Sequence, residues 1–158
     1  MNSHNNPDSN NIFLFQVRAM PVLAGWGAFS ILTGWAWWQL SGRWLRGLAA
    51  QFAGWGAINL LIALFGIRGA QRKNIQFTQG EISLEEHDRQ ARVFEKVVAV
   101  NAALDLGYMA AGAWLNHQPD DERRGMGMGI IIQGLFLFLW DLVLWQLVRT
   151  FRINHGRV

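Results

Sequence analysis

Six polar side chains lie inside long apolar stretches of the sequence, and these are the residues whose types best suit chemistry. The clearest case is Asp141, which stands alone among apolar residues in FLWDLVLW (138–145). Asp105 lies in a second apolar stretch. A carboxyl group in such surroundings can hold a proton, form hydrogen bonds or bind a cation. The full set is Gln51, Asn59, Asn101, Asp105, Gln133 and Asp141.

The composition indicates that these apolar stretches lie in a lipid bilayer. Hydrophobic residues make up 51% of the chain and charged residues 16%, whereas average soluble domains are roughly 25% charged. Most charges fall in four blocks, around 43–46, 68–96, 120–124 and 149–157. A soluble helix would carry charges all along its wet face. The lipid bilayer is therefore the first expected partner of this chain.

Four stretches have the length of about 20 residues that a membrane-spanning helix needs. They lie at about 21–40, 48–67, 96–115 and 127–148, and the first can start as early as Ile12. Two short connections predict two antiparallel helical hairpins. The sequence therefore predicts an all-α fold, a four-transmembrane-helix bundle in a single domain at 12–150. A polar tail at 1–11 and a basic tail at 151–158 flank this domain.

The charged segment 68–95 is predicted to be a loop that also contains the start of the third helix. Ser83 and Glu86 have the spacing of a capping box. The third helix is therefore expected to begin near Leu84 in the cytoplasm and to run without a break into the membrane.

The distribution of Lys and Arg predicts the orientation in the membrane. Of the 14 basic residues, ten lie in the N-terminal segment, 68–96 and the C-terminal segment, and four lie in the two short connections. Because basic residues favour the cytoplasmic side, both termini are expected in the cytoplasm, with the chain in the inner membrane. An aromatic belt is then expected at the opposite interface, formed by Trp35, Trp37, Trp38, Trp44 and Trp114.

Small residues recur at positions where helices could approach closely. The tetrapeptide GWGA occurs at 25–28 and again at 54–57, and the third helix carries a stripe of small residues at a spacing of four. Small side chains let membrane helices approach backbone to backbone. The predicted close-packing positions are Gly25, Gly27, Gly54, Gly56, Ala103, Gly107 and Ala111.

Helix rise places the polar residues in two layers. Asp141 lies about 5 Å to the cytoplasmic side of its helix midpoint. Asn59, Asn101 and Asp105 fall at similar depth, and Gln51 and Gln133 form a second layer toward the far side. No Lys or Arg lies in the central turns of any span. Each aspartate must therefore be protonated, hydrogen-bonded, or in contact with a cation or water, because a bare charge is costly there.

Other motifs add no chemistry. The chain has no cysteine, which excludes thiolate ligands and nucleophiles. GMGMG (125–129) lacks the lysine and the spacing of a phosphate-binding loop, so we interpret it as the start of a membrane helix. The four histidines lie outside the central turns and lack metal-site spacing. No catalytic residue, metal site, cofactor or nucleic-acid partner is expected.

Three segments resemble a family of small bacterial four-helix membrane proteins of unknown function. They are QFAGWGAINLLIALFG (51–66), NAALDLGYMAAGAWL (101–115) and RGMGMGIIIQGLFLFLWDL (124–142). The resemblance implies the four-helix membrane fold and the same set of polar positions within the membrane. It implies no activity.

Two kinds of function remain open. The first is a non-enzymatic membrane protein, either a scaffold or accessory subunit of a larger complex or a bundle that binds a hydrophobic ligand; it would have a membrane-protein partner or form a homo-oligomer. The alternative is a small oligomeric transporter or channel component that moves protons, cations or a small substrate through Asp105 and Asp141. A structural role for both aspartates, fixing helix register by hydrogen bonds, is compatible with the first.

Overall fold

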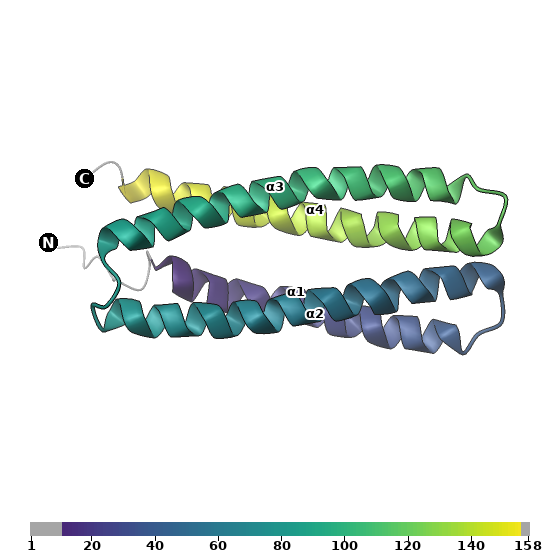
Figure 1. Ribbon diagram of the computed structural model, residues 1–158, viewed down its shortest axis with the longest axis horizontal. Helices are drawn as coiled ribbons and strands as arrows, with labels where there is room; N and C mark the ends of the chain where they lie inside the picture. The colour runs from purple at the N-terminus through teal and green to yellow at the C-terminus, as the bar shows by residue number, and fades with distance from the viewer. Residues whose placement is uncertain (1–10, 156–158) are drawn as a thin grey trace, which may run out of the picture.

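The chain folds into four long helices that form two antiparallel hairpins. The computed structural model describes residues 11–155, with side chains described for 11–150. The helices are α1 (Ile12–Trp38), α2 (Arg43–Thr78), α3 (Leu84–Asn116) and α4 (Asp121–His155). The α1–α2 and α3–α4 hairpins lie side by side along one axis (Figure 1). All four helices are long and apolar enough to cross a membrane, which confirms the predicted all-α four-helix fold.

The helices continue beyond the predicted spans, so the prediction of a loop is wrong for 68–78, whereas the start of the third helix near Leu84 is confirmed. α2 runs to Thr78 and α3 begins at Leu84, leaving 79–83 as the connection. At 1.5 Å per residue the 36 residues of α2 extend about 54 Å, against about 30 Å for a bilayer core. The extensions remain packed because buried Ala70 and Ala91 interrupt the charged sequence.

The two predicted tails, 1–11 and 151–158, differ in how much of each the structure describes. α4 continues to His155, so most of the segment 151–158 is helical and not a separate tail. The N-terminal segment 1–11 lies outside the described residues except for Asn11, and 156–158 also lie outside them.

α3 begins where its capping sequence predicts. The hydroxyl of Ser83 accepts a hydrogen bond from the backbone N–H of Glu86 at 3.2 Å. The Glu86 carboxylate accepts hydrogen bonds from Arg89 and Gln90, both at 2.7 Å, and these lie further along the same helix. α3 then continues without a break to Asn116.

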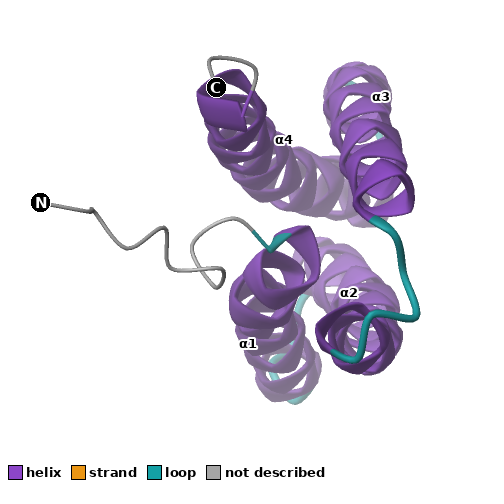
Figure 2. Ribbon diagram, turned by 90° about the vertical axis from the view of Figure 1, so that its left-hand side faces the viewer, coloured by secondary structure: helices purple, strands orange, loops and turns teal. Residues whose placement is uncertain are grey.

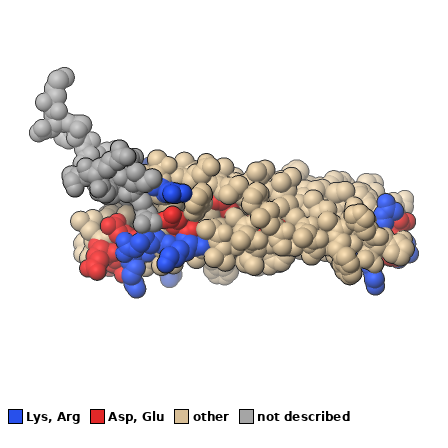
Figure 3. All heavy atoms as spheres, turned by 90° about the horizontal axis from the view of Figure 1, so that it is seen from above, with Lys and Arg blue, Asp and Glu red and all other residues tan. Residues whose placement is uncertain are grey.

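Charged residues gather toward the two ends of the bundle, and a long stretch of other residues separates them on the face shown in Figure 3. At the end with the two short connections, Trp35, Trp38 and Trp114 are exposed, as is Trp44 to a smaller degree. Trp37 is half-buried against the ring of Phe52, with ring centroids 5.0 Å apart. These tryptophans thus share one end of the bundle.

α1 and α2 approach closely through the second glycine of each GWGA copy. A Cβ atom on Gly56 would lie 2.8 Å from the carbonyl oxygen of Gly27, and one on Gly27 would lie 2.8 Å from that of Gly56. The first glycines, Gly25 and Gly54, have open space where a Cβ would be. They are exposed, so the prediction of close packing is wrong for them. The two glycines of each copy differ because positions two apart point about 200° away from each other.

α2 and α4 make the close contact between the hairpins. A Cβ on Gly47 would overlap the backbone carbonyl of Glu122, and a Cβ on Gly125 would overlap that of Trp44. These contacts leave no room for any side chain at either glycine.

The GMGMG segment also lets α4 approach α3. Gly127 points about 200° away from Gly125, and its Cβ would lie 2.5 Å from the carbonyl oxygen of Gly112 on α3. Gly129 points back to α2, where its Cβ would lie 2.6 Å from the Cβ of Gln51. The alternating glycines therefore allow α4 to pack between α2 and α3. Sequence reasoning recognised the segment as a helix start and missed this role.

The small-residue stripe on α3 is not packed within the described bundle. Ala103, Gly107 and Ala111 are all exposed, and open space surrounds the position of a Cβ on Gly107. The prediction of close packing at this stripe is therefore wrong for the single chain. α3 uses a narrow seam that includes Ala102 and Asp105, and Ala103 is turned about 100° from Ala102.

The helix ends near the termini are joined by a buried polar contact. The side chain of Asn11 caps α1 and donates a hydrogen bond to Asn74 of α2 at 2.7 Å. The Nε2 atom of His87 in α3 accepts a hydrogen bond from the backbone N–H of Ile12 at 3.1 Å, and its ring stacks on Phe77 of α2. Figure 2, viewed from this end, shows the two hairpins side by side. The contact ties α1 to both α2 and α3.

The GWGA glycines provide a matched test of the packing. Gly56→Ala should lower the free energy of unfolding by about 1–3 kcal/mol, because the new methyl group collides with backbone. Gly54→Ala, two residues away in the same helix, should change it by less than about 0.5 kcal/mol. Unfolding of the detergent-solubilised protein by sodium dodecyl sulfate measures both. Equal effects of the two substitutions would contradict the α1–α2 register.

Candidate functional site

The polar layer nearer the short connections is fully hydrogen-bonded. Gln133 of α4 is completely buried. Its Nε2 donates to the hydroxyl of Ser30 at 3.0 Å, and its Oε1 accepts from the indole N–H of Trp26 at 2.8 Å. The indole of Trp26 stacks on the ring of Phe136, with centroids 4.0 Å apart. This layer therefore joins α4 to α1 with paired polar groups.

Sequence reasoning missed two members of this layer and misjudged a third. Ser30 and Trp26 lie four residues apart and so share one face of α1, which was the available signal. Gln51 was expected in the same layer as Gln133. It is half-buried on the contact between α2 and α4, where its Cβ lies against Gly129.

The second layer contains buried polar atoms without partners. Asn59 of α2 and Asp105 of α3 are 2% and 4% exposed. Among the described residues, the buried side-chain nitrogen and oxygen atoms that lack a hydrogen-bond partner are Nδ2 of Asn59, Oδ2 of Asp105 and Nε1 of Trp140. Such atoms are costly in any interior. They are the main reason to treat this layer as the candidate site.

The register of the helices places these residues at similar depth. A Cβ on Gly134 of α4 would lie 3.5 Å from the backbone carbonyl of Asp105. Gly129 lies against Gln51 of α2, and α2 and α4 run in parallel. Eight residues further along both helices, Asn59 reaches the level of Leu137. Asn59 and Asp105 therefore both lie beside 134–138 of α4.

Asp141 lies further along α4. Its side chain is half-buried. It lies seven residues, or about 10 Å, along α4 from Gly134, which contacts Asp105. The structure thus places Asn59 and Asp105 at a similar level, with Asp141 closer to the helix ends near the termini.

Asn101 does not join this layer, so that part of the prediction is wrong. Its side chain is exposed. Depth was estimated correctly, since Asn101 is one turn from Asp105, but the buried seam of α3 runs through Val98 and Ala102. Ala102 is turned about 100° from Asn101, which leaves the amide on the outer surface.

The layer combines hydrogen-bond acceptors and donors in a protein interior. Asp105 offers a carboxylate oxygen, whereas the amide of Asn59 and the indole of Trp140 offer N–H groups. The arrangement can therefore hold a proton, a cation or a water molecule. In the described part of the chain, no three His, Cys, Asp or Glu side chains form a group that could hold a metal ion.

The short connection between α3 and α4 has its own electrostatic contact, outside the membrane. The backbone N–H of Arg123 donates to Asp120 at 3.0 Å, and Arg43 forms an ion pair with the same carboxylate. The backbone hydrogen bond and the nearby Arg43 hold the pKa of Asp120 below its usual range. This contact joins the tips of the two hairpins.

The two layers should respond in opposite ways to the same chemical change. Gln133→Leu should lower the free energy of unfolding by about 1–3 kcal/mol, because it leaves the hydroxyl of Ser30 and the indole of Trp26 unpaired. Asn59→Leu should be neutral or stabilising, because it removes an amide whose Nδ2 has no partner. Unfolding in detergent measures both values. A cost for Asn59→Leu as large as that for Gln133→Leu would show that Asn59 is hydrogen-bonded in the folded protein.

Comparison with known proteins identifies the family. No curated protein and no solved structure matches the chain. Residues 22–142 match the model of a family of unknown function, DUF6992. The match includes all six polar positions and the GMGMG segment, and it confirms the resemblance to an uncharacterised family. The chain is therefore a member of the DUF6992 family of unknown function.

Proposed function

We propose that this multi-pass membrane protein is a non-enzymatic scaffold that binds another membrane-spanning helix through the outer surface of α3. The observation that carries the proposal is the exposure of Asn101. Asn101 lies five residues, or about 7.5 Å, inside the membrane from Lys96. An amide facing lipid at that depth has no water to pair with. A hydrogen bond to a second helix would satisfy it.

The neighbours of Asn101 have the spacing of a helix-packing seam. Val97, Leu104 and Tyr108 are exposed large side chains, and Ala111 is also exposed. With Asn101 they follow one another at intervals of four, three, four and three residues, which is the a/d spacing of a coiled coil. We call these five residues the Asn101 face. α3 packs mainly on α4. The ring of Tyr108 contacts that of Trp55 of α2, with centroids 5.3 Å apart, whereas Val97, Asn101, Leu104 and Ala111 are exposed and form the open part of this face.

A second copy of the chain is the simplest partner for the Asn101 face. A two-fold axis along the membrane normal would set two α3 helices parallel and bring Asn101 opposite Asn101. Each amide then has both a donor and an acceptor for its partner. A single polar residue at such a position also fixes register and oligomeric state.

Disulfide crosslinking tests the Asn101 face without background from native thiols, because the sequence contains no cysteine. Leu104→Cys should form a disulfide-linked dimer on mild oxidation in membranes. Leu106→Cys is the matched control, since Leu104 and Leu106 are 52% and 51% exposed but point about 200° apart.

The product of this experiment also identifies the partner. Asn101→Leu added to Leu104→Cys should reduce crosslinking several-fold if the amide pair sets the register. Crosslinks of equal yield at 104 and 106, or at neither, would contradict the proposed face. A crosslink from Leu104→Cys to a different protein would keep the scaffold function and exclude the second copy.

The second candidate function is proton or cation transfer through Asp105 and Asp141. The unpartnered Oδ2 of buried Asp105 and the position of half-buried Asp141 about two turns further toward the helix ends near the termini favour it. Purified protein in proteoliposomes should then dissipate a proton or cation gradient, and Asp105→Asn or Asp141→Asn should abolish the flux while the protein still folds. Asp121→Asn, at an exposed acidic residue, is the control. Flux no greater than that of empty liposomes would exclude this candidate.

The proposal includes an orientation, with both termini and residues 79–83 in the cytoplasm of a cell whose inner membrane holds the protein. The ten-to-four distribution of basic residues supports it. Gln79→Cys and Ser41→Cys lie in exposed connections at opposite ends of the bundle. In intact cells an impermeant thiol reagent should label the cysteine at 41 and leave the one at 79 unlabelled. The reverse pattern would invert the orientation.

A further inference from the structure

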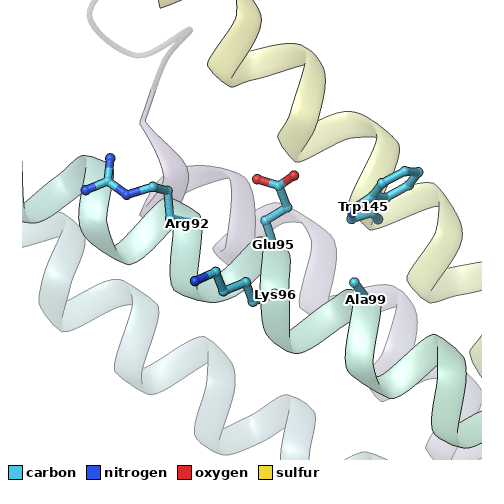
Figure 4. A pocket seen from close by; sticks show the side chains of 5 residues that line it. All are labelled: Arg92, Glu95, Lys96, Ala99 and Trp145. Carbon is cyan, nitrogen blue, oxygen red and sulfur yellow. The ribbon is translucent and has the colours of Figure 1, made fainter.

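A pocket of about 250 Å³ lies between α3 and α4 near the predicted cytoplasmic boundary of the membrane. Its walls are formed by Arg92, Glu95, Lys96 and Ala99 of α3 and by Trp145 of α4. Figure 4 shows these side chains, with Trp145 on α4 and the other four along α3. The pocket is separate from the Asp105 layer and from the Asn101 face.

One wall of the pocket is basic. The side chains of Arg92 and Lys96 extend to the same side in Figure 4, and both residues are exposed. Arg149 does not line the pocket, but its guanidinium carbon lies 5.2 Å from the ring centroid of Trp145, which does. Glu95 has an interaction partner of its own. An arginine fork beside a lysine is a favourable site for a phosphate group.

The other wall is apolar and leads toward the membrane. Ala99 lies about one turn further into the bilayer than Lys96, and its small side chain leaves the groove beside Trp145 open. Indole rings favour the level of lipid headgroups. A ligand that fits both walls has an anionic head at Arg92 and Lys96 and an apolar chain along Ala99 and Trp145.

We propose that this pocket binds the phosphate headgroup of an anionic phospholipid, with the start of an acyl chain against Trp145 and Ala99. Basic pockets between membrane helices on the cytoplasmic side are suited to such headgroups. The lipid would link α3 to α4 on the predicted cytoplasmic side of the level at which Gly112 and Gly127 bring the two helices together. The inference is independent of the proposed role of the Asn101 face.

Lipid retention by the full chain in mild detergent tests the site. After incubation with phosphatidylglycerol or phosphatidylcholine, native mass spectrometry should show a retained molecule of the anionic lipid and much less of the zwitterionic one. Arg92→Gln with Lys96→Gln should weaken retention about 30-fold, which follows from the usual contribution of two basic residues. The control is Arg68→Gln with Arg72→Gln, which removes the same charge from exposed positions on α2.

A second substitution tests the pocket itself at constant charge. Ala99→Leu fills the apolar wall and should also abolish retention, whereas Ala50→Leu, at an exposed alanine of α2, should not. Inorganic phosphate at equal concentration should not displace the lipid. Equal retention of both lipids, equal loss in the two double variants, unchanged retention in Ala99→Leu, or displacement by inorganic phosphate would each overturn the proposal.

Discussion

A bilayer core contains no water, so each polar side chain within it needs a partner from the protein or must bear the cost of having none. Polar side chains in the bundle meet this constraint in three different ways. Gln133 is buried and fully paired with Ser30 and Trp26. Asn59 and Asp105 are buried but retain unpartnered atoms. Asn101 faces outward. The hydrogen bonds of Gln133 thus make it a structural position. The polar groups of Asn59, Asp105 and Asn101 can still bind a proton, an ion, water or another helix.

Glycine contacts decide which of these outcomes each residue has. Because Gly125 and Gly127 point to opposite sides of α4 and meet α2 and α3 respectively, α4 is held between two helices at fixed register. That register brings Gly134 beside Asp105 and sets Asp141 about two turns beyond it. The polar layer is thus a consequence of backbone contacts about two turns away from it, which is why substitutions at those glycines would disturb both packing and site.

Several features were predictable from sequence because they depend on one helix at a time. Span number followed from apolar length, and the start of α3 from the capping sequence at Ser83. The direction in which a residue faces depends on neighbouring helices, so Asn101 was expected inside but is exposed. Gln51 does face α4, but it lies beside Gly129, about one turn from Gln133. The loop prediction failed for 68–78 because charged and polar residues there outnumber the few buried positions, such as Ala70, that keep this part of α2 packed.

We propose that α3 presents the exposed amide of Asn101 to a second helix, so that the protein works as part of an assembly. The most direct measurement is the number of subunits in single complexes, counted by stepwise photobleaching of fluorescently labelled protein in its native membrane. The account predicts two copies in each complex for the wild type and a shift to single chains in Asn101→Leu. Isolated single chains for the wild type, or an assembly that Asn101→Leu leaves intact, would contradict it.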